Sequence, residues 1–123
     1  MSEYESDYYD EDDEDLVMRL AQFVGRALKR KQAVIGQDRF INLARRKQIG
    51  FLWLTEDISK SSFKRIVMDC EKFDIPCIIR GKSDDIALFT RYESTKVYIV
   101  KKSMSGLKQF VSELPEDIYC YVG

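Results

Sequence analysis

Hydrophobic positions follow two different periods along this chain. From Leu16 to Leu28 apolar residues recur at steps of three and four, which predicts a helix that ends in the basic run 29–31. The same spacing predicts further helices over 37–47, 63–73 and 104–114, with a short one around Ile86. Compact apolar runs predict strands at 33–35, 51–54, 77–79 and 96–100.

Strands that alternate with helices indicate an α/β protein. The run 51–54 is apolar at every position, as is typical of a central strand buried on both faces. We therefore expect a three-layer α/β/α sandwich around a four-stranded mixed sheet. Residues 118–122 are apolar enough to dock on this body, and an edge strand is one way for them to do so. A chain of 123 residues has room for one core, which predicts a single domain over 16–123.

Charge divides the chain into two unequal parts. Nine of the 21 acidic residues lie in 1–15, which contains no base, so residues 16–123 carry 20 basic side chains against 12 acidic ones. Self-repulsion and the lack of aliphatic residues predict a disordered acidic tail over 1–15. The positive body is typical of a protein that binds a polyanion, although many domains of this size carry such a charge without doing so.

Composition also argues against several kinds of chemistry. The chain has no histidine and three cysteines, Cys70, Cys77 and Cys120, too few ligands for a tetrahedral zinc or iron–sulfur site. We expect reduced, buried thiols and no cofactor. Without histidine, and without any glycine-rich nucleotide motif, an enzyme is not expected. The paired acids at 56–57 and 84–85 are expected to cap helices.

No apolar stretch approaches the ~18 residues of a membrane span, and the acidic start is unlike the basic start of a signal peptide. We therefore expect a cytoplasmic protein with no membrane partner.

Three segments together resemble a known family: 33–36, a strand followed by a glycine turn; 51–59, a strand that ends in Leu-Thr-Glu-Asp-Ile-Ser; and 70–79, with a Cys-Glu start and an Ile-Pro junction before a strand. Their spacing resembles that of the kink-turn RNA-binding ribosomal protein superfamily. This superfamily includes ribosomal proteins L-seven-Ae and L-thirty-e and small bacterial relatives. The resemblance implies their fold and a non-catalytic protein that contacts structured RNA through the turn after 33–35 and the loop after 77–79.

The turn motif of that family is only partly present. Gly36 matches the family's glycine, but Asp38 stands where asparagine is usual, Arg39 where glutamate or glutamine is usual, and Asn42 where lysine is usual. Replacement of an acceptor by Arg39 turns a contact for a base edge into a donor, which suits a phosphate better. In the second loop region the two family glycines are replaced by Ala87 and Arg91.

The resemblance implies a set of RNA-binding residues, in which backbone amides after Gly36 and nearby basic side chains meet the RNA. This set is Lys31, Gly36, Gln37, Asp38, Arg39, Asn42, Glu56, Lys82, Ser83 and Arg91. The expected partner is structured RNA, either a kink-turn or ribosomal RNA. The alternative is a family member that has lost kink-turn binding and acts as a protein-interaction or assembly factor, with the acidic tail in its contact surface.

Overall fold

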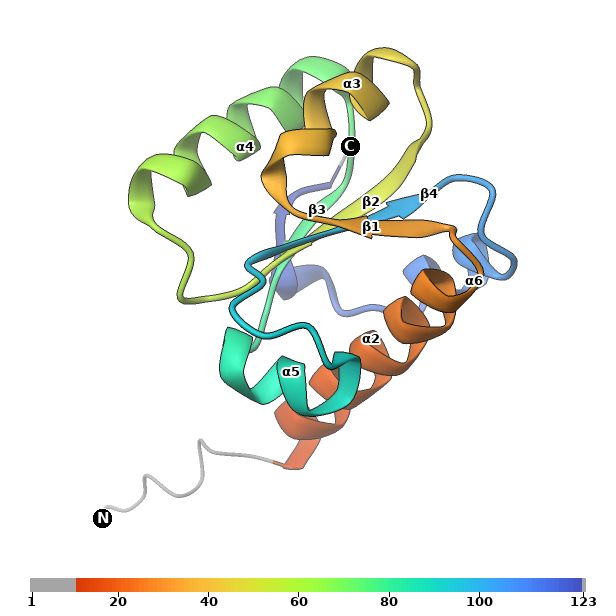
Figure 1. Cartoon of the computed structure of the whole chain (residues 1–123), viewed down its shortest axis with the longest axis vertical. Coiled ribbons are helices and arrows are strands. Elements are labelled where there is room, and N and C mark those ends of the chain that lie inside the picture. Colours follow the sequence, from red (N-terminus) through yellow and green to blue (C-terminus); the bar gives the residue numbers. More distant parts are fainter. Residues whose placement is uncertain (1–10, 123) are drawn as a thin grey trace.

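The computed structural model describes residues 11–122, with the backbone alone for 11–13. Five helices and five strands alternate along this part of the chain (Figure 1). The α-helices are α2 (Glu11–Lys29), α3 (Phe40–Arg45), α4 (Lys60–Phe73), α5 (Ser83–Thr90) and α6 (Leu107–Ser112), and 3-10 turns span Gln37–Arg39 and Glu116–Ile118. The strands are β1 (Ala33–Ile35), β2 (Ile49–Leu54), β3 (Cys77–Ile79), β4 (Val97–Lys101) and β5 (Tyr119–Tyr121).

The strands form one mixed sheet in the order β1-β4-β2-β3-β5. Strand β4 runs antiparallel to both β1 and β2, while β2 and β3 are parallel. The prediction of four strands was wrong by one, because β5 adds antiparallel to β3, with Cys77 opposite Tyr121. This last strand has three residues, too few to show a periodic pattern of their own, and its partner sets its place.

Both faces of the sheet are covered, as the continuous apolar run of β2 predicts. Successive side chains of a strand point to opposite faces. Phe51 and Trp53 therefore lie in a core with α2, α5 and α6, whereas Leu52 and Leu54 lie in a second core with α3 and α4. Figure 1 shows the first three helices on one face of the sheet and the other two on the opposite face. These four side chains are at most 1% exposed. The result is the expected arrangement of three layers.

Aromatic rings join three elements of the first core. The Phe23 ring of α2 stacks on the Phe110 ring of α6 with 4.0 Å between centroids, and Phe51 of β2 lies 6.2 Å from Phe110. Because aromatic pairs gain energy beyond the area they bury, this contact fixes the short helix α6 against α2 and the sheet.

Helix α2 begins at Glu11, five residues before the predicted start at Leu16. Residues 11–15 are all acidic, and the positive end of a helix stabilises acidic side chains, so this part of the expected disordered tail is helical. Residues 1–10 lie outside the described residues. Two other predicted helices are shorter than expected: the stretch 37–47 divides into a 3-10 turn and α3, and α6 covers only the middle of 104–114.

The three thiols, one each from α4, β3 and β5, lie together where this helix packs on the sheet. Cys70 and Cys77 are buried and Cys120 is half-buried. The neighbouring thiols of Cys120 and Cys70, together with burial, raise the pKa of Cys77, which keeps this thiol protonated and unreactive at neutral pH. Within residues 11–122 no group of three or more histidine, cysteine or acidic side chains is arranged to hold a metal ion. No helix in the same range is long and apolar enough to cross a membrane.

We predict that Leu52→Ala lowers the free energy of unfolding by about 2–5 kcal/mol, because it opens a cavity in a strand buried on both sides. Leu88→Ala is the matched control, since Leu88 is 77% exposed and Leu52 is fully buried. Chemical unfolding followed by the fluorescence of the single, buried Trp53 measures both variants. Equal losses would contradict the described packing.

Candidate nucleic-acid interface

One edge of the sheet gathers the segments named by the family resemblance. The carboxyl ends of β1, β2 and β3 meet the amino end of β4 there, because β4 runs against β1 and β2. The Gly36 amide donates to the Val97 carbonyl at 2.9 Å, and the Thr55 amide donates to the Lys96 carbonyl at 3.0 Å. These bonds hold the ends of β1 and β2 beside the start of β4.

The turn after β1 depends on the backbone of Gly36. Its φ of 95° and ψ of 150° belong to a conformation that only glycine adopts readily. No atom within 4 Å would meet a Cβ built here, so the backbone angle, and not lack of space, requires glycine. The 3-10 turn Gln37–Arg39 follows at once and leads into α3.

The loops after β2 and β3 are tied together by two acidic side chains. Glu56 Oε2 accepts from the Gly81 amide at 2.8 Å, and the Glu56 amide donates to the Gly81 carbonyl at 2.7 Å. Asp57 Oδ1 accepts from the amide of Ser83, the first residue of α5, at 3.1 Å. The expectation of a capping role therefore holds for Asp57, but on α5. Ser59 caps the following helix α4 by accepting from the Ser62 amide at 3.2 Å.

Asp57 is also the centre of a charged network. The Ser83 hydroxyl donates to Asp57 Oδ2 at 2.6 Å, and Lys96 Nζ lies 3.1 Å from the same oxygen and 3.0 Å from the Ser83 hydroxyl. Partial burial opposes ionisation of the carboxyl, but the bonds from Ser83 and Lys96 outweigh it and hold the pKa of Asp57 well below its usual range. The carboxylate stays charged and fixes the start of α5 against the start of β4.

A groove of about 500 Å³ lies at this edge. It is lined by three segments, 35–37 after β1, 57–59 after β2 with Ser62 of α4, and 94–97 at the start of β4. Hydroxyl groups dominate its polar lining, from Ser59, Ser62, Ser94 and Thr95. Hydroxyls both donate and accept hydrogen bonds, so the groove can meet sugar hydroxyls and base edges as well as phosphates.

The structure distributes the predicted contact residues over more than one surface. Gly36 and Gln37 line the groove, and the exposed Asp38, Arg39 and Asn42 follow on the same turn and on α3. Glu56 lies at this edge, and Lys82 and Arg91 flank the two ends of α5. Ser83 is only 2% exposed and its hydroxyl is engaged by Asp57.

Lys31 is separated from this group. It lies between the end of α2 and β1, with its amide donating to the Leu28 carbonyl at 3.1 Å. Gly36 follows the other end of β1, so the two residues are at opposite edges of the sheet.

The groove residues 94–96 and Ser62 were not predicted from the sequence. Residues 94–96 precede a strand that is antiparallel to its neighbours, so they lie beside Gly36 only because of the order of the strands. No local signal in the sequence reports that order. Ser62 lies in the first turn of α4, next to the capping residue Ser59. The serines at 59, 61 and 62 are the sequence signal for the start of that helix.

Solved structures that are similar to this chain include the following two proteins. An RNA binding protein of 15.5 kD from Giardia lamblia matches with a TM-score of 0.66 and 16% identity, over 80% of this chain and 83% of its own. This fold is one that an RNA-binding protein uses. A protein of unknown function from Bacillus halodurans matches with a TM-score of 0.65 and 18% identity, over 76% of this chain and 96% of its own. At these identities the likeness shows the fold. No family model matches the chain, and no curated protein matches it.

We predict that Asp57→Asn lowers the free energy of unfolding at pH 7 by about 1 kcal/mol, a small value because the side chain is partly exposed. The charge stabilises the fold fully above the ordinary pKa of 3.8, and this stabilisation is lost as the pH falls below that value. The difference between variant and parent should therefore shrink on acidification. Glu93→Gln, at an exposed acid of the same edge, is the control. A difference independent of pH would contradict the charged role of Asp57.

Proposed function

We propose that this protein is a non-catalytic RNA-binding protein of the kink-turn-binding type, which contacts folded RNA through the groove beside Gly36. The observation that carries the proposal is the convergence of three loop segments on one groove, next to a glycine turn of the kind that the family resemblance requires. The fold shared with the Giardia lamblia RNA binding protein supports it.

The chemistry of the groove favours recognition of shape over attraction of charge. The one base among its lining residues, Lys96, is already paired with Asp57. The remaining polar groups are the Gln37 amide, hydroxyls and backbone, which suit the sugar and base edges of an unstacked or bent RNA. Such a surface discriminates between RNA shapes and contributes little long-range electrostatic attraction.

A protein-interaction or assembly factor is the second candidate. The departures Asp38, Arg39 and Asn42 support it, and so does an exposed apolar surface. Leu88, Phe89 and Tyr92, on α5 and just after it, are 77%, 47% and 41% exposed. Large exposed apolar side chains that lie close together are typical of protein contacts. Absence of any RNA binding would favour this function over the first.

We predict that the protein binds a kink-turn RNA more tightly than a straight duplex of equal length, and that Gly36→Ala reduces this preference by about tenfold, or about 1.4 kcal/mol. Alanine cannot adopt the positive φ of Gly36 without strain, so the turn that faces the groove would move. Gly25→Ala is the control, because Gly25 also has open space for a Cβ but lies within α2, away from the groove and without a positive φ. Fluorescence anisotropy gives both affinities. An unchanged preference in Gly36→Ala would contradict the groove as the site.

We also predict that Arg39→Glu, which restores the family's residue type, increases the preference for a kink-turn that contains G·A pairs, because a carboxylate accepts from the amino edge of guanine. If Arg39 contacts a phosphate, the same change weakens binding of every RNA equally. Affinities for the two RNAs at a common salt concentration separate the cases. No change for either RNA would remove Arg39 from the interface.

A further inference from the structure

The edge of the sheet opposite the groove is strongly basic. Three connections meet there: α2 to β1, α3 to β2, and β4 to α6. The Lys101 amide donates to the Gln32 carbonyl, and the Lys102 amide donates to the Gln48 carbonyl, both at 2.8 Å, so the three connections lie side by side. We call their basic residues the basic edge: Lys29, Arg30, Lys31, Arg45, Arg46, Lys47, Lys101, Lys102 and Lys108.

The charges of the basic edge are not compensated by neighbouring acids. All of its residues are exposed except Lys101, which is half-buried. Within residues 11–122, none of them forms an ion pair with a carboxylate. The groove edge is different, because its bases are balanced by acids: Asp38, Glu56, Asp57, Asp84, Asp85 and Glu93. The positive charge of the body is therefore concentrated away from the groove.

Helix ends explain only part of this concentration. Basic residues at the ends of α2 and α3 complement the negative ends of these helices. Lys101 and Lys102 instead end a strand, where no such field exists. Lys108 lies in the first turn of α6, at the positive end of that helix, where a base is disfavoured. The field of a helix end therefore does not account for the positions of these three lysines.

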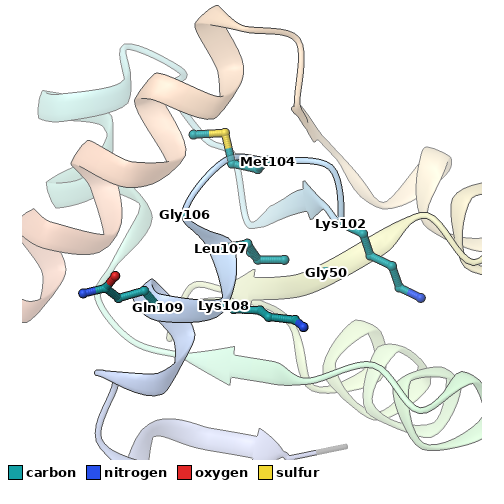
Figure 2. A pocket seen from close by; sticks show the side chains of 7 residues that line it. All are labelled: Gly50, Lys102, Met104, Gly106, Leu107, Lys108 and Gln109. Carbon is teal, nitrogen blue, oxygen red and sulfur yellow. The ribbon is translucent and has the colours of Figure 1, made fainter.

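Lys102 borders two hollows in this surface. One, of about 650 Å³, is lined by Gly50, Leu107 and Lys108 among others, and Figure 2 shows the Lys102 and Lys108 side chains extending in the same direction past Gly50. A Cβ at Gly50 would come within 2.5 Å of Leu107 Cδ2, so glycine lets α6 approach β2 and brings Lys108 close to Lys102.

The second hollow, of about 360 Å³, extends the basic surface toward α4. Arg45, Lys47, Lys72 and Lys102 line it, with one acid, Asp74, whose carboxylate already accepts from the Tyr121 hydroxyl at 2.9 Å. Basic side chains thus border a continuous stretch of surface across the ends of β1, β4 and β2. Two strand spacings make this stretch about 10 Å long, which is enough to face several phosphates of a nucleic-acid helix.

We propose that the basic edge binds the phosphate backbone of an RNA duplex, at a site separate from the groove, so that the protein contacts RNA from two opposite edges of its sheet. The proposal deepens the proposed RNA-binding function and rests on it. RNA is favoured over an anionic membrane because a membrane-binding surface pairs its bases with apolar side chains that enter the lipid. The large exposed apolar residues of the described chain are Met68, Leu88, Phe89, Tyr92 and Val122, none of which belongs to the basic edge or lines its two hollows.

The test compares two double variants that change the net charge equally. Lys102→Glu with Lys108→Glu alters the basic edge, and Lys64→Glu with Arg65→Glu alters exposed residues of α4. The probe is a straight RNA duplex of about 20 base pairs, measured by fluorescence anisotropy from about 50 to about 200 mM salt. We expect the first variant to bind at least tenfold more weakly, with the salt slope reduced by about two, one for each lost contact. Circular dichroism checks that both variants fold.

The outcomes separate this proposal from the proposed function. Equal losses in both variants, or duplex binding by Lys102→Glu with Lys108→Glu as tight as that of the parent, would overturn the basic edge while leaving the kink-turn preference and the groove intact. Failure of the parent to bind any RNA would overturn both. If Lys102→Glu with Lys108→Glu loses binding to phosphatidylserine vesicles but binds RNA as the parent does, the basic edge is assigned to a membrane instead.

Discussion

The rest of the structure depends on the pairing of β4 between β1 and β2. Strands β2 and β4 are buried on both faces, and the antiparallel order of the three strands places the start of β4 beside the turn after β1 and its end beside the connection that precedes β1. The groove at one edge and the basic surface at the other are therefore opposite ends of a single strand. A change that shifted the register of β4 would alter both surfaces together, because a shift of one residue reverses which side chains face each core.

An element of this fold is predictable from the sequence when it is long enough to show its own hydrophobic period. Helices α2 and α4 are long enough for their periodicity to identify them, and the apolar run of β2 indicates burial on both faces. The start of α2 was misplaced because acidic residues suit both a disordered segment and the first turn of a helix. The sequence does not determine the fifth strand, because three residues are too few to show a period and their conformation depends on pairing with β3.

The candidate site was predictable only where a single turn determines it. Gly36 could be identified because its role depends on its own backbone angle and on the residues next to it. Ser94, Thr95 and Lys96 could not, because the order of strands brings them to the groove. Lys31 shows the opposite effect: it is near Gly36 in the sequence, yet a strand of three residues lies between them and separates the two edges. Sequence distance says little about spatial distance across a strand.

Charge is distributed unevenly along helix α2, with acidic residues at its start and basic residues at its end. Its first residues, 11–15, are acidic, its last turn holds Arg26 and Lys29, and about 28 Å separates the two ends at 1.5 Å per residue. With the basic edge continuing from its far end, the protein carries a permanent dipole moment despite a net charge of only −1. In the field of a polyanion such a molecule experiences a torque before it makes contact, and it arrives with one end foremost. Its orientation at first encounter thus depends more on how charge is divided between its two ends than on its total charge.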